Sequence, residues 1–135
     1  MEDAIGYSRA LVVPDPGGDW IFVSGTTGFD YATMSISEDV VEQARQCLQN
    51  ITAALAEAAS SPSDIVRVHY ILPLREDFEP CWPILRDFFG EIRPAATMIE
   101  AGLADPRMKI EIEVTARKPI ATRVLPVTFP SESNI

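Results

Sequence analysis

The chain has 135 residues, of which 47% are hydrophobic, and this is enough for one domain with a buried core. Its formal net charge is -9 and its 11 basic residues are scattered, which argues against nucleic acid or an anionic membrane as a partner, because phosphate groups bind clustered lysine and arginine. No apolar run approaches the roughly 20 residues that span a bilayer, and the acidic start Met1-Glu2-Asp3-Ala4 is unlike a secretory leader. The sequence therefore predicts a soluble cytoplasmic protein.

Metal and thiol chemistry have little support in the sequence. The chain has two cysteines, Cys47 and Cys81, outside any CxxC pair, and one histidine, His69. A structural zinc site takes about four nitrogen or sulfur ligands, so this set is too small. We expect two free thiols in a reducing compartment, no metal and no cofactor.

The first 36 residues predict a β-hairpin and a short extra strand. Tyr7–Val13 is apolar and β-prone, and the proline- and glycine-rich residues 14–18 after it are typical of a turn. Trp20–Ser24 then has the composition of the second strand. A further short strand is expected near Thr33–Ile36.

Spacings of three and four between apolar residues predict a first helix. Ser37 is the expected N-cap, followed by two acidic residues that favour the positive end of the helix dipole. Pro62 marks the stop, because proline cannot continue a helix. The expected buried stripe consists of Val40, Val41, Ala44, Leu48, Ile51, Leu55 and Ala58.

The second half of the chain predicts a strand, a helix and two more strands. Ile65–Leu72 is a β-branched run, and a second helix is expected from Arg75 to a C-cap at Gly90. The two final strands are expected at Thr97–Gly102 and Lys109–Arg117. The helix should bury Phe78, Trp82, Leu85 and Phe89.

This order of elements predicts an α+β fold with both helices on one face of a single mixed sheet. Along the last strand, apolar side chains alternate with polar ones, so one face is expected under the helices and the other is expected to be bare. A bare sheet face is often covered in an oligomer. We expect one domain over residues 1–118 and an extended or partly disordered tail over residues 119–135. The apolar positions are Ile110, Ile112, Val114 and Ala116, and the polar ones are Lys109, Glu111, Glu113 and Thr115.

Several short motifs occur in the order found in a known family. They are Gly6-Tyr7-Ser8-Arg9-Ala10, Phe22-Val23-Ser24-Gly25, Gln43 with Asn50 seven residues later, Pro94-Ala95, and Lys109-Ile110-Glu111-Ile112-Glu113. No single motif is decisive, but the ordered set covers roughly residues 4–118. With these motifs the chain resembles the Rid or YjgF-like family, also called L-PSP endoribonucleases.

The resemblance implies a chorismate-mutase-like fold and a homotrimer. Three sheets would form a central barrel with the helices outside, and small-molecule clefts would lie at the subunit interfaces. Active members of the family hydrolyse reactive enamines and imines made by pyridoxal-phosphate enzymes. In them an arginine binds the substrate carboxylate, a glutamate positions the attacking water, and a first-strand tyrosine and a backbone amide complete the cleft.

By this resemblance the glutamate falls on Glu111, the tyrosine on Tyr7 and the glycine of the amide on Gly25. The arginine does not carry over, because Ala96 holds its place and a methyl group cannot pair with a carboxylate. Alternation along the first strand puts Arg9 on the same face as Tyr7, so Arg9 is a candidate for the missing cation. We therefore expect weak or absent activity on standard 2-imino acids.

Each of these residues also has a purely structural interpretation. Glu111 fits a solvated or interface carboxylate, Tyr7 a packed strand aromatic, and Arg9 a surface or intersubunit salt bridge. The predicted function is a trimer that binds a small metabolite, with hydrolase or deaminase action on imine-like or unsaturated substrates as its enzymatic form. The alternative is a non-catalytic binding or regulatory trimer. An endoribonuclease is weaker, because the chain is acidic and lacks a histidine suited to act as general base.

Overall fold

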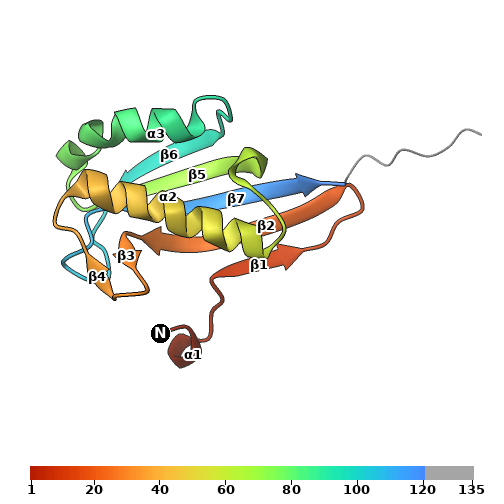
Figure 1. Ribbon diagram of the computed structural model, residues 1–135, viewed down its shortest axis with the longest axis horizontal. Helices are drawn as coiled ribbons and strands as arrows, with labels where there is room; N and C mark the ends of the chain where they lie inside the picture. Colours follow the sequence, from red (N-terminus) through yellow and green to blue (C-terminus); the bar gives the residue numbers. More distant parts are fainter. Residues whose placement is uncertain (121–135) are drawn as a thin grey trace, which may run out of the picture.

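The computed structural model describes residues 1–120, which form one five-stranded mixed sheet with two helices on one face (Figure 1). The strand order is β1-β2-β7-β5-β6, and every neighbouring pair is antiparallel except β5 and β6. This arrangement confirms the predicted α+β fold with both long helices on one side. The strands are β1 (Ala10–Val13), β2 (Gly18–Thr27), β5 (Ile65–Leu72), β6 (Ala95–Glu100) and β7 (Glu111–Pro119), and the helices are α2 (Val40–Glu57) and α3 (Trp82–Phe89).

Smaller elements connect these parts. The short helix α1 (Glu2–Ile5) precedes β1, and a two-stranded ribbon of β3 (Phe29–Asp30) and β4 (Ser35–Ile36) joins β2 to α2. Three 3-10 turns span Pro62–Asp64, Arg75–Asp77 and Glu79–Cys81. None of the helices in this part of the chain has the length and apolar character that a membrane crossing requires.

The core lies between the helices and the sheet, and β7 is the central strand. The alternation expected along this strand is confirmed, because Ile110, Ile112, Val114 and Ala116 are at most 1% exposed. Between them, the side chains of Glu111 and the other odd-numbered residues face the bare side of the sheet. Burial of this apolar row beneath the helices, together with Ile21 and Val23 of β2, holds the helices and the sheet together.

Helix α2 begins two residues later than the pattern predicts. Asp39 is the N-cap, and its carboxylate accepts a hydrogen bond from the backbone N–H of Val41 at 3.4 Å. The expected cap, Ser37, instead accepts a hydrogen bond from the Asp39 backbone N–H at 3.1 Å. Both residues are good caps, so the composition alone did not separate them.

A buried glutamine fastens α2 to the segment that leads into β7. Gln43 is fully buried, and its side-chain amide donates to the backbone oxygens of Ser37 (2.7 Å) and Arg107 (2.9 Å). Its side-chain oxygen accepts from the Lys109 backbone N–H at 2.8 Å. Next to it, Gly28 permits close packing, because a Cβ at this position would lie 2.6–2.7 Å from Gln43 main-chain and Cβ atoms. The start of α2 is therefore held at a fixed height above the sheet.

Several sequence expectations need correction. The second helix begins at Trp82 rather than at Arg75, and the two final strands span 95–100 and 111–119 rather than 97–102 and 109–117. The first strand begins at Ala10 rather than at residue 7, because residues 2–5 form α1 and Gly6 ends it in a left-handed conformation. Trp82 is 52% exposed rather than buried, because two 3-10 turns precede α3 and rotate the stripe that an unbroken helix would present. Pro119, expected in the tail, is the last residue of β7 and pairs with Gly18. In the rest of the expected tail, Ile120 is exposed, and residues 121–135 lie outside the described residues.

Candidate functional site

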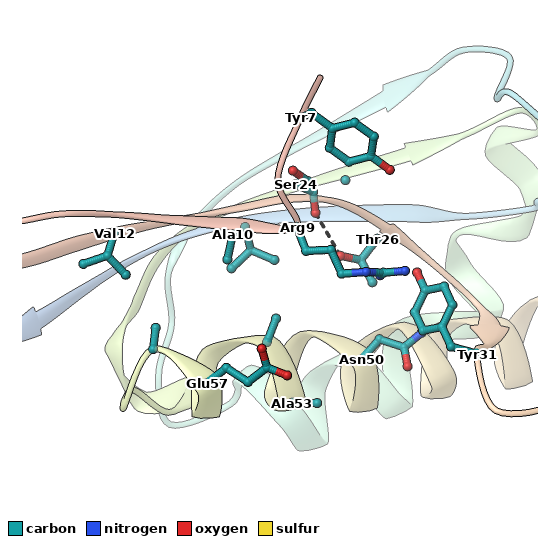
Figure 2. A pocket seen from close by; sticks show the side chains of 14 residues that line it. Tyr7, Arg9, Ala10, Val12, Ser24, Thr26, Tyr31, Asn50, Ala53 and Glu57 are labelled. Atoms are coloured by element: carbon teal, nitrogen blue, oxygen red, sulfur yellow. Dashed lines mark hydrogen bonds between the residues drawn. The ribbon is translucent and has the colours of Figure 1, made fainter. Parts of the chain in front are cut away.

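A cavity of about 620 Å³ lies between the outer part of the sheet and α2. Strands β1 and β2 form one wall, and α2 forms the facing wall (Figure 2). Alanine and valine side chains make up its apolar surface. Its other lining residues are Tyr7, Arg9, Ser24, Gly25, Thr26, Tyr31, Asn50 and Glu57.

Arg9 supplies a positive charge to this cavity. Its guanidinium carbon lies 3.8 Å from the centre of the Tyr31 ring, and Figure 2 shows the side chain directed toward that ring. The Arg9 Nε atom also pairs with the Glu2 carboxylate of α1 at 2.8 Å. Stacking on an aromatic face limits the orientations of a long side chain, so the cation is held in place while half of it stays exposed.

A bulge in β2 shapes the strand wall. Val23 pairs with Val114 and Thr26 pairs with Ile112, so Ser24 and Gly25 together stand opposite one residue of β7. The Ser24 hydroxyl donates to the backbone oxygen of Ser8 at 2.5 Å, and the Ser24 backbone N–H donates to the Arg9 oxygen at 2.8 Å. These two bonds fasten the segment that carries Tyr7 and Arg9 to the bulge.

Glu111 lies directly against the bulge. A Cβ placed on Gly25 would be 1.9 Å from Glu111 Oε2, so only glycine leaves room for the carboxylate there. The pKa of Glu111 is raised above the ordinary carboxyl value, first because burial disfavours the charged form and second because Glu113 is close. A carboxyl group with a raised pKa exchanges protons more readily near neutral pH than an ordinary one does.

The helix wall is a stripe of small and polar residues along α2. Asn50 donates from its side-chain amide to the backbone oxygens of Thr27 (3.1 Å) and Phe29 (2.8 Å), which fixes this wall to the end of β2 and to β3. Ala53 and Ala54 follow one turn later, and Glu57 follows after two turns. Spacings of three, four and seven place all four on one helix face, beside the buried apolar stripe.

The structure brings some of the residues singled out in the sequence together and leaves one apart. Tyr7, Arg9 and Gly25 line the same cavity, and Glu111 stands on the other side of Gly25. Ala96 lies in β6, at the opposite edge of the sheet from β1. It pairs with the buried Val68 of β5, so its methyl group is on the helix side of the sheet, the side on which the cavity lies.

Sequence reasoning missed Tyr31 and Glu57. Tyr31 follows the two-residue strand β3, whose position depends on its pairing with β4 and on Asn50, and no local pattern shows this. Glu57 could have been found from the sequence. It lies on the same helix face as Asn50, Ala53 and Ala54. A row of small residues beside an apolar stripe indicates a surface that faces something other than solvent.

The thiols and the histidine take no part in this cavity. Cys47 and Cys81 are buried and unpaired, and burial raises the pKa of the Cys81 thiol to about 11 and that of the Cys47 thiol further still. His69 lies on the bare face of the sheet and is bonded to Glu113. Within residues 1–120, no three His, Cys, Asp or Glu side chains are grouped in a way that could hold a metal ion.

The family model described as Endoribonuclease L-PSP matches residues 1–118. Two curated relatives are a RutC family protein of Pyrococcus abyssi, 34% identical over 83% of this chain and 86% of its own length, and a 2-iminobutanoate/2-iminopropanoate deaminase of Salmonella typhimurium, 32% identical over 73% and 80%.

Solved structures agree with this relationship. The Mycobacterium tuberculosis protein Rv2704, described as a member of the YjgF/YER057c/UK114 family, has a TM-score of 0.75 and 32% identity over 86% of this chain and 90% of its own. Escherichia coli TdcF, solved with bound serine, has a TM-score of 0.73 and 27% identity over 83% and 87%. The match over nearly all of the described residues, in sequence and in fold, shows that this chain belongs to the endoribonuclease L-PSP family, known also as the Rid or YjgF-like family.

Proposed function

We propose that this protein binds a small carboxylate-bearing metabolite in the cavity between β1, β2 and α2, at the boundary between subunits of a homotrimer. The observation that carries the proposal is the position of Arg9. It places a cation in the same cavity as Tyr7 and Gly25, and the carboxyl group of Glu111 lies against Gly25 on its other side. One cation, aromatic walls and a few polar groups in a partly enclosed space suit a small polar ligand.

The edge strands and the bare face of the sheet are features that support a subunit interface at this cavity. Strands β1 and β6 are its outermost strands, and the bare face exposes large apolar side chains. Leu11 is 58% exposed, Phe22 46% and Ile99 45%. If β6 of one subunit lay beside β1 of the next, Ala96 would join the cavity, because both are on the helix side.

Hydrolysis of an imine is the reaction that this arrangement suits best. A water molecule would attack the carbon of a protonated C=N bond while Glu111 accepts one of its protons, which gives a neutral carbinolamine. Glu111 would then return that proton to the nitrogen. As the C–N bond breaks, the hydroxyl proton would pass to the departing ammonia, which leaves a carbonyl group and an ammonium ion. The raised pKa of Glu111 supports both transfers. A relative of this chain is named as a 2-iminobutanoate deaminase.

A non-catalytic binding role is the second candidate, and two observations favour it. Ala96 provides no charge for a substrate carboxylate, and Glu2 already occupies the Nε edge of Arg9. Cleavage of RNA has less support. Among the residues described, Arg9 is the only lysine or arginine that lines the cavity, and the chain carries a net charge of -9.

Ammonia release from 2-iminobutanoate separates these candidates. Loss of a charged hydrogen bond to a carboxylate costs about 1.5–3 kcal/mol, or about one to two factors of ten in rate. We expect the natural protein to be slower by that factor than a relative with arginine at this position. Ala96→Arg should recover activity, and Glu111→Gln should abolish the recovered activity.

The control is Ala95→Arg, next to the tested position but on the other face of β6. The natural protein could release ammonia as fast as an active relative, with no change in this rate on Ala96→Arg. That result would show that a charge at position 96 is not needed for the reaction. If Ala96→Arg binds substrate without turnover, the non-catalytic role is the correct one.

A further inference from the structure

The cavity carries opposite charges at its two ends. Arg9 lies at the end marked by Tyr31 and Asn50 (Figure 2). Glu57 lines the same cavity seven residues after Asn50 on α2, which corresponds to about 10 Å along the helix at about 1.5 Å per residue. Figure 2 shows the Glu57 side chain rising from the helix on the side that faces the strand wall.

Between these ends the cavity is apolar. Ala10 and Val23 contribute from the strands, and Ala53 and Ala54 contribute from the helix. None of these side chains can form a hydrogen bond, so the middle section suits a short run of methylene groups. The small size of the three alanines is what leaves the space open.

Both charges are available to a ligand. Glu57 is exposed and forms no ion pair with any residue in the described part of the chain. Arg9 pairs with Glu2 through its Nε atom and also interacts with Tyr31, and no other acidic residue in the described part of the chain pairs with it. The Glu2 pair also shows that this guanidinium accepts a carboxylate while it is stacked on Tyr31.

We infer that the ligand is dipolar, with a carboxylate that binds Arg9 and a protonated amine that binds Glu57. This inference rests on the proposed function and names the chemical class of its ligand. The helix rises about 10 Å from Asn50 to Glu57, and the side chains that reach in from both walls shorten the space left for a ligand. A short ω-amino acid with a few methylene groups between its charges is of this scale.

Calorimetric titration with butanoate and 4-aminobutanoate tests the inference. The two compounds share a carboxylate and a carbon chain and differ in the terminal ammonium. The natural protein should bind 4-aminobutanoate about fivefold more tightly, as expected for one additional partly exposed ion pair. Glu57→Gln should remove this preference, so that the two compounds bind with similar affinity. Glu42→Gln, a loss of the same charge from α2 outside the cavity, should preserve the preference.

The possible results separate this inference from the function on which it rests. Equal affinity for the two compounds, or a preference that survives Glu57→Gln, would overturn the dipolar ligand but leave a carboxylate site in place. If the carboxylate site is correct, Arg9→Gln must lower the affinity of the protein for both compounds. If neither compound binds the natural protein, or if Arg9→Gln has no effect, the proposed function and the dipolar ligand both fail.

Discussion

The chain has a methyl group at position 96 and a guanidinium at position 9. Both positions lie on the helix side of the sheet, one on an edge strand and one just before the other edge strand. Arg9 is also stacked on Tyr31 and paired with Glu2, so the structural interpretation of this residue and the binding one are compatible. A cation that already holds an internal carboxylate is preorganised for an external one, which must displace or accompany Glu2.

Glu111 was accessible to sequence reasoning, whereas its environment was not. The alternation of β7 placed its side chain on the bare face, and the family resemblance gave it a role. The contact with Gly25 depends on the β2 bulge, which shifts the register between Val23 and Thr26. Alternation predicts which face a residue lies on, but a bulge changes which residues of a neighbouring strand it meets.

The raised pKa of Glu111 predicts a dependence of stability on pH. A carboxyl group whose pKa is higher in the folded chain than in the unfolded chain stabilises the fold fully below its ordinary pKa. That contribution is lost as the pH rises through the raised value. At pH 7 the half-buried carboxylate therefore lowers the free energy of unfolding.

Glu111→Gln should increase the urea midpoint at pH 7, and the difference from the natural protein should disappear near pH 4. Protein concentration must be the same in both series, because assembly also contributes to stability. A variant that is less stable at pH 7 and equal at pH 4 would show that the charged form of Glu111 stabilises the fold.

At the level of elements, the long periodic segments were predictable. Residues 65–72 and the alternation along β7 were assigned correctly, and the stripe of α2 was assigned to within two residues at its start. The apolar residues of β7 repeat over nine residues and those of α2 over 18 residues. A repeat of that length fits one type of secondary structure far better than the other.

Short elements were not predictable in the same way. Helix α1 has four residues, no buried side chain and no side-chain cap bond, so no local signal marks it. Trp82 has the spacing of a core residue but lies at the surface, because the preceding turns at Arg75–Asp77 and Glu79–Cys81 are not α-helical. In both cases the tertiary structure determines the outcome, and the local sequence does not.

Gln43 is expected to be a main determinant of stability among the residues of α2. Gln43→Leu would leave the Lys109 N–H and the Arg107 and Ser37 carbonyl groups without their side-chain partner. A buried polar group without a partner costs about 1–3 kcal/mol. We therefore expect a loss of about 2–5 kcal/mol in the free energy of unfolding, measured by urea denaturation at fixed protein concentration.

Gln49→Leu is the matched control, because Gln49 is exposed on the same helix. Its effect should stay within about 0.5 kcal/mol. Equal effects of the two substitutions would mean that the buried bonds of Gln43 contribute nothing beyond those that water would provide.

At the scale of the whole molecule, the bare face of the sheet has an ordered polar network. His69 Nδ1 and Glu113 Oε1 are 2.7 Å apart, and Arg67 Nε donates to His69 Nε2 at 2.9 Å. The other end of the Arg67 guanidinium donates to the Thr97 hydroxyl at 3.0 Å. The network joins strands β5, β6 and β7, and exposed apolar side chains such as Phe22 lie on the same face.

Such a face is better suited to contact with other subunits than to bulk water. The members of this network are already hydrogen-bonded to one another, so their burial leaves few unsatisfied hydrogen bonds, and the apolar groups gain free energy when they leave water. The family resemblance implies three subunits, whose sheets would enclose a central barrel. This arrangement would bring β6 of each subunit beside β1 of the next and would close the cavity at Arg9.

The central claim is that the ligand cavity lies between subunits of a trimer, and the molar mass in solution tests it most directly. Light scattering on the eluting peak at micromolar concentration should give about three times the chain mass of 14.9 kDa. The value should not change on tenfold dilution within that range. A mass of one chain would contradict the claim. The cavity would then be an open groove at one edge of a single sheet, and Ala96, at the opposite edge, would not line it.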